Sequence, residues 1–79
     1  MMKVYSVIYT LCDDILQNEL DNIYPTVESA IKCAKRIGKL KHCYEVVVDE
    51  DIVDESGRHF NREMYREKHE EHYDNYYKL

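Results

Sequence analysis

The hydrophobic positions of the chain change their period from one segment to the next. From Lys3 to Leu11 they are β-branched, aromatic or aliphatic and occupy both faces of an extended segment, which predicts a strand that is central or covered by a helix. From Val27 to Ile37 they recur at i, i+3, i+4, i+7 and i+10, which predicts an amphipathic helix. Thr26 is suited to begin this helix as its N-cap, and Gly38 is suited to end it.

A second strand is predicted from Tyr44 to Val48, and two continuations of it are open. Either residues 49–51 turn into a short strand at 52–53, or the strand continues to a turn at 55–57 and returns over 58–60. Gly57 favours the second continuation, because glycine accepts positive φ at low cost. Residues 13–24 are polar and acid-rich, and we expect a connection there with a short helical turn or a folded-back loop.

The C-terminal residues 61–77 separate into two unlike stripes when they are placed at 100° per residue. This separation predicts a C-terminal amphipathic helix over 61–77, with Asn61 as its N-cap. One stripe consists of Tyr65, His69, His72, Tyr73 and Tyr76, and the opposite one consists of Glu63, Glu67, Glu70, Glu71 and Asp74.

The order of these elements, β-α-β-(β)-α, predicts an α+β fold in one small domain over residues 1–79. Its sheet has two to three strands and packs against one amphipathic helix, with the C-terminal helix added. The middle helix is long enough for a right-handed crossover between parallel strands, and an antiparallel arrangement is also open.

Composition and charge narrow the function class. The chain of 79 residues carries a net charge of −5 and has eight Tyr and no Trp, which favours a protein-binding surface over direct binding of nucleic acid. The spacing of Cys12, Cys33 and Cys43 matches no zinc ribbon or redox pair, so we expect buried, reduced thiols. The apolar run from Val4 to Cys12 is too short for a membrane span, and the expected compartment is the cytoplasm.

The chemistry-bearing residues do not form an enzyme motif. Catalysis by Cys43 with His42, Asp49 or Asp51 would require a cleft that excludes water, and a domain of this size has little room for one. We therefore expect no enzyme activity and no cofactor. His69 and His72 supply only two of the four ligands of a zinc site, so membership of the Tyr/His stripe is the favoured interpretation and zinc binding the alternative. The basic stripe at Lys32, Lys35, Arg36 and Lys39 is interpreted as a solvated helix face, with phosphate or anionic lipid contact as the alternative.

The predicted row of carboxylates is the sharper functional hypothesis. Residues three and four apart on a helix stand about 5–6 Å from each other, which is close to the spacing of phosphates along a nucleic-acid strand. The row is therefore expected to imitate a nucleic-acid backbone and to bind in a basic groove of another protein. The alternative is an ordinary solvated face. A secondary acidic patch that extends the row consists of Asp49, Glu50, Asp51, Asp54 and Glu55. The Tyr stripe either docks on the sheet of its own chain or contacts a partner, which includes a second copy.

In size, acidity, tyrosine content and lack of motif, the chain resembles phage-encoded inhibitors of bacterial defence, such as anti-CRISPR proteins. The resemblance is one of type and carries over no site residue. It implies an acidic, non-enzymatic inhibitor in the host cytoplasm that occupies the basic nucleic-acid-binding groove of a protein partner. The alternatives are a homodimeric structural or regulatory module and a small zinc-binding protein.

Overall fold

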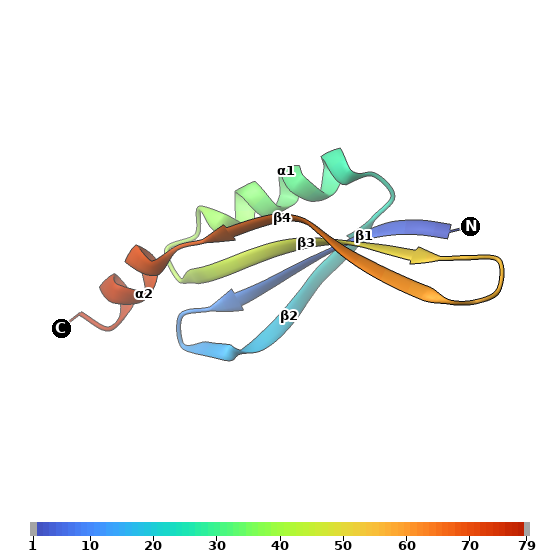
Figure 1. Ribbon diagram of the computed structural model, residues 1–79. Coiled ribbons are helices and arrows are strands. Elements are labelled where there is room, and N and C mark those ends of the chain that lie inside the picture. The colour runs from blue at the N-terminus through green and yellow to red at the C-terminus, as the bar shows by residue number, and fades with distance from the viewer. Residues whose placement is uncertain (1, 79) are drawn as a thin grey trace.

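The computed structural model describes residues 2–78, which form an α+β fold with a four-stranded antiparallel sheet and two helices (Figure 1). The strand order is β2-β1-β3-β4. Helix α1 covers one face of the sheet, and α2 lies at the end of the sheet where β4 stops (Figure 1). The elements are β1 (Met2–Leu11), β2 (Asp14–Tyr24), α1 (Val27–Gly38), β3 (Cys43–Val53), β4 (His59–Lys68) and α2 (Glu70–Tyr76).

Strand β1 is central, as its two apolar faces predict. It pairs with β2 on one side and with β3 on the other, and both pairings are antiparallel. The strands predicted from Lys3 to Leu11 and from Tyr44 to Val48 are therefore antiparallel, as the second alternative allows. Helix α1 instead connects β2 to β3, which run parallel to each other on either side of β1. Val7 lies opposite Val48, and both side chains are fully buried under α1.

Helix α1 forms where its apolar period predicts it. The Thr26 hydroxyl accepts a hydrogen bond from the Ser29 amide at 3.2 Å, which caps the helix start. The small residues Ala30 and Ala34 are fully buried, so the helix lies close to Val46 and Val48 of the sheet. At the helix end, a Cβ at Gly38 would stand 2.5 Å from Glu67 Oε1, so a larger residue there would displace the Glu67 side chain.

All three cysteines are free and buried, which confirms the expected core thiols. Burial raises the pKa of Cys43 to about 11, and it also raises the pKa of Cys12. These thiols therefore remain protonated and act as packing groups.

The turn between β3 and β4 confirms the second of the two predicted continuations. Asp54 Oδ1 accepts hydrogen bonds from the backbone amides of Ser56 and Arg58, both at 2.9 Å, and Gly57 has a φ of 83°. The turn bonds also hold the pKa of Asp54 below its usual value, with the Ser56 hydroxyl as the largest cause.

The predicted helix over 61–77 is wrong for its first half. Residues 61–68 belong to β4 and pair with β3, and only Glu70–Tyr76 is helical. The turn at Gly57 brings β4 beside β3, and the ladder of backbone hydrogen bonds that follows outweighs the helical spacing of the side chains. One β-bulge interrupts the pairing: Val48 lies opposite Tyr65 and Asp49 opposite Glu63, so Met64 has no opposite residue.

Residues 14–24 also differ from the expected connection, because they form the edge strand β2. Its pairing with β1 is irregular: Glu19 lies opposite Tyr9 and Asp14 opposite Leu11, so residues 15–18 face only Thr10. Tyr24, at the end of β2, packs against the core.

Candidate functional site

The face of the sheet opposite α1, here called the open face, carries two kinds of surface. Strand pairing places residues in rows across the sheet, and paired residues share a face. The β2 and β1 side of the open face is mainly apolar, with Leu20, Ile23 and Ile8, and Val47 of β3 adjoins it. The β3 and β4 side is acidic. Its carboxylates, here called the open-face carboxylates, are Glu45, Asp49, Asp51 and Glu63.

Two of the open-face carboxylates, Asp49 and Asp51, have no cationic partner in the part of the chain that the structure describes. Asp51 accepts hydrogen bonds from the Ser6 hydroxyl and from the Asn61 amide, each at 2.6 Å. Asp49 lies directly opposite Glu63, so two acids share one cross-strand position. Within residues 2–78, no Lys or Arg forms an ion pair with Asp49 or Asp51.

The negative charges of the other two open-face carboxylates, Glu45 and Glu63, are offset by the guanidinium of Arg66. Arg66 reaches Glu45 at 2.8 Å and donates from Nε to Glu63 at 2.9 Å. Partial burial, followed by the nearby charge of Asp51, raises the pKa of Asp49. The charged form of Asp49 is therefore less favourable in the folded protein than in the unfolded chain.

The predicted secondary acidic patch is divided between the two faces. Glu50 points to the α1 side, where it is 3% exposed and accepts a hydrogen bond from the Tyr5 hydroxyl at 3.0 Å. Its carboxylate also lies 3.8 Å from Lys3 Nζ and 3.3 Å from Arg62. Asp49 and Asp51 belong to the open face, while Asp54 and Glu55 belong to the turn. The patch is thus not one surface.

The predicted carboxylate row is not continuous either, because its residues lie on two elements. Glu63 is on the open face of β4, and Glu67 is on the opposite face, against Gly38. Glu70, Glu71 and Asp74 are exposed on α2. Glu67 is half-buried and accepts hydrogen bonds from Tyr65 and from a ring nitrogen of His69. It ties β4 to His69, the residue that begins α2, so its carboxylate is engaged within the chain.

The tyrosines of the Tyr/His stripe pack mainly against their own chain. Tyr65 packs against the core under α1, and Tyr73 lies with its ring centroid 5.5 Å from that of Tyr44 on β3. The Tyr77 hydroxyl donates to the Cys12 carbonyl at 3.1 Å. Tyr76 is 48% exposed, so of the three predicted tyrosines it is the one available to a partner.

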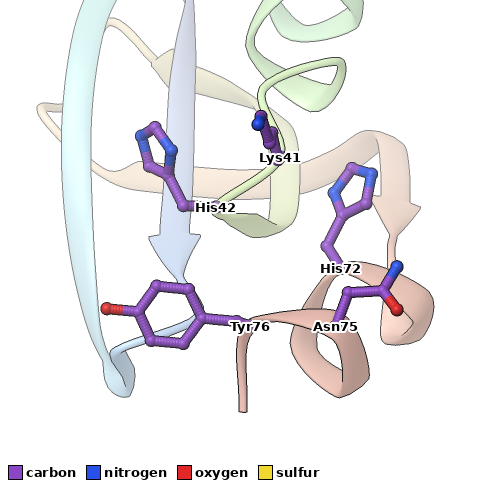
Figure 2. A pocket seen from close by; sticks show the side chains of 5 residues that line it. All are labelled: Lys41, His42, His72, Asn75 and Tyr76. Atoms are coloured by element: carbon purple, nitrogen blue, oxygen red, sulfur yellow. The ribbon is translucent and has the colours of Figure 1, made fainter. Parts of the chain in front are cut away.

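A second cluster lies where β4 meets α2, and we call His69, Glu71 and His72 the junction cluster. Their possible metal-binding atoms all lie within 4.8 Å of one another. Burial lowers the pKa of His69, but hydrogen bonds to Glu71 and Glu67 more than offset this, so the net shift is upward. His72 also lines a pocket of about 260 Å³, together with Lys41, His42, Asn75 and Tyr76. These side chains lie between α2 and the loop before β3 (Figure 2).

Several site residues could not be found from the sequence. Glu45 and Arg66 reach the open face only through the register of β3 and β4. The sequence predicts a connection over residues 13–24, where the structure has the exposed apolar side chains of β2. An exposed edge strand of this kind is a common interaction element. Leu16 is 95% exposed, Leu20 58% and Ile23 51%.

Comparison with protein-family models, with curated proteins and with solved structures finds no match to this chain. Among the described residues, no helix has both the length and the apolar character needed to cross a membrane.

Proposed function

We propose that this is a non-enzymatic binding protein whose open face docks on a basic surface of a protein partner. The observation that carries the proposal is the placement of Asp49 opposite Glu63 across two paired strands. Like charges directly opposite each other destabilise a sheet. A pair of acids kept in this position, with the pKa of Asp49 raised, is accounted for by a partner that supplies Lys or Arg.

The apolar half of the open face supports a contact with a macromolecule. Leu20 and Ile23 are more than half exposed, and Ile8 and Val47 continue the same surface across the sheet. A hydrophobic area beside a charged area is the usual anatomy of a protein interface. We infer that the apolar half contributes most of the binding free energy and the carboxylates set the choice of partner.

A groove that otherwise holds nucleic acid is the partner surface that fits best. Asp49 and Asp51 are two residues apart on β3, so their backbone positions lie about 7 Å apart. This is the scale of the phosphate spacing along a nucleic-acid strand, whose backbone winds around an axis with a rise of about 3.4 Å per nucleotide. The proposal keeps the nucleic-acid mimicry and the cytoplasmic inhibitor role expected from the resemblance to phage-encoded inhibitors, and moves the surface from a helix to the sheet.

The test uses reversal of the two opposed acids. The partner is first captured on the immobilised protein from a host lysate and purified, and it is then loaded with a labelled nucleic acid. We expect the wild-type protein to displace the nucleic acid, as measured by fluorescence polarisation. Asp49→Lys with Glu63→Lys should weaken this displacement at least about 100-fold, because like charges then face each other across the interface.

A matched control separates the site from the overall charge. Glu19→Lys with Glu55→Lys reverses two exposed acids away from the open-face carboxylates. Each reversal adds two positive charges, so both double variants change the formal net charge from −5 to −1. Equal losses in the two double variants, or a partner that never binds nucleic acid, would refute the proposal.

Homodimerisation is the second candidate, and the exposed edge strand β2 favours it. Its apolar side chains, with Leu16 95% exposed, lie on a strand that has one side unpaired in the sheet. Light scattering of the purified protein over a range of concentrations distinguishes the candidates. The homodimeric module is favoured if the wild-type protein has the molar mass of a stable dimer, Leu20→Lys has that of a monomer, and no nucleic-acid-binding partner is captured.

A further inference from the structure

The junction cluster is built on a fixed backbone. The His69 amide donates to the Tyr44 carbonyl at 2.7 Å, which ties the end of β4 to β3. The His72 amide then donates to the His69 carbonyl at 3.1 Å at the start of α2. Both imidazoles are mostly buried, with side-chain exposures of 18% and 20%. The backbone position of His69 is therefore determined by the sheet, and that of His72 by the first turn of α2.

Each imidazole has one nitrogen bound to an acceptor outside the cluster. His69 Nε2 lies 2.5 Å from Glu67 Oε1, and His72 Nδ1 lies 2.8 Å from the Cys43 carbonyl oxygen. When these nitrogens donate their protons, the lone pairs belong to His69 Nδ1 and His72 Nε2. Metal-binding histidines are held in this way, with the second N–H donated to a carboxylate or a backbone carbonyl.

The two remaining nitrogens face one carboxylate. Glu71 Oε1 lies 3.1 Å from His69 Nδ1 and 4.0 Å from His72 Nε2. Zinc bonds of about 2.0–2.1 Å at tetrahedral angles place two ligand atoms about 3.3 Å apart, which lies between these distances. Two imidazoles and one carboxylate form a set that suits zinc and neighbouring transition metals.

One adjustment is required for binding. The His69 and His72 rings are stacked, with centroids 4.4 Å apart and planes only 12° from parallel, so one ion cannot lie in both planes. A rotation of the His69 ring about χ2 removes this restriction, because that torsion has a broad energy well and its acceptor, the Glu67 side chain, can move with the ring. Glu71 is 66% exposed and is free to follow the ion.

We propose that His69, Glu71 and His72 bind one divalent transition-metal ion of the zinc type, with water in the remaining position. The ion links the end of β4 to α2. This site is independent of the proposed function, because the open-face carboxylates take no part in it. Glu67 and the Cys43 carbonyl act as positioning groups, since they orient the imidazoles without touching the ion.

Titration of the purified full chain with Co²⁺, followed by the visible absorption of the bound ion, tests the proposal, and Zn²⁺ displacement measures the affinity for zinc. We expect one ion per chain and a higher melting temperature with Zn²⁺. His72→Ala and Glu71→Gln should each weaken binding at least tenfold, and Glu67→Gln about 10- to 100-fold. Glu71→Gln alters an exposed side chain, so it serves even if His72→Ala fails to fold.

His59→Ala is the matched control, because His59 is an exposed histidine at the opposite end of β4. It should leave Co²⁺ binding and the Zn²⁺-dependent melting temperature unchanged. Absence of saturable binding by the wild-type chain, or equal weakening in His59→Ala and His72→Ala, would overturn the proposal.

Discussion

Glu50 and Asp49 are neighbours on β3, yet they lie on opposite faces of the sheet and in opposite electrostatic circumstances. Glu50 is 3% exposed and is surrounded by the Tyr5 hydroxyl, Lys3 and Arg62. Asp49 is more exposed but lies opposite another acid, Glu63. The face that packs against α1 satisfies the charge of Glu50 internally, whereas on the open face Arg66 pairs with Glu45 and Glu63, and no Lys or Arg among residues 2–78 pairs with Asp49 or Asp51. The two acids therefore differ in how far their own chain satisfies them.

The largest expected difference between the faces comes from the valines beside these acids. Val48 is fully buried, whereas Val47 lies on the open face. Val48→Asp should cost about 4 kcal/mol or more, because it buries an unpaired charge, and Val47→Asp about 1 kcal/mol. Urea denaturation followed by circular dichroism measures both. Similar costs in the two variants would mean that the open face is covered in solution.

A smaller effect is expected from Glu50→Gln. The change removes the acceptor charge that faces Lys3 and Arg62 while it keeps the side-chain shape, so we expect a loss of about 1–3 kcal/mol. The exposed positions of both cations place the value toward the low end of that range. The free energy of unfolding from urea titration measures the loss. No loss would show that the buried acid is not held by its neighbours.

The smallest effect has the opposite sign. The pKa of Asp49 is raised in the folded state, so wild-type stability decreases as pH rises through the window between the unfolded and folded pKa values. Asp49→Asn should therefore stabilise the protein at pH 7, by at most about 0.5 kcal/mol after solvent screening, and the gain should vanish at low pH. Thermal unfolding at several pH values measures it. The same variant should bind the partner less well; a variant that is less stable at pH 7 contradicts the comparison.

The sequence predicts the elements whose pattern is local. The helix from Val27 to Gly38 has both an apolar period and the Thr26 cap, and the turn at Gly57 needs a residue that accepts positive φ. The helical spacing of residues 61–68 predicts the wrong element, since in the strand Tyr65 and Glu67 share one face and, across the bulge at Met64, Glu63 lies on the other. Only pairing with β3, which is a non-local interaction, decides between the two.

The candidate site was predicted in pieces for the same reason. Asp49, Asp51 and Glu63 were all named as acidic candidates, but the sequence placed Glu63 on a helix. Glu45 and Arg66 join them through the register of the strands, which no single segment specifies. The sequence places Glu71, the third member of the junction cluster, in the acidic stripe, because a 100° helical projection puts it on the side away from the centre of the Tyr/His stripe.

The bulge at Met64 decides which sign of charge the far end of the β3–β4 hairpin displays. If the pairing continued without it, Glu63 would move opposite Glu50 on the α1 side, and Arg62 would turn outward. Two carboxylates would then meet in a poorly hydrated position, so the slipped register is electrostatically penalised. The extra residue at the bulge thus fixes the register of the β3–β4 hairpin. It disfavours the alternative pairing, in which Arg62 instead of Glu63 would lie on the open face.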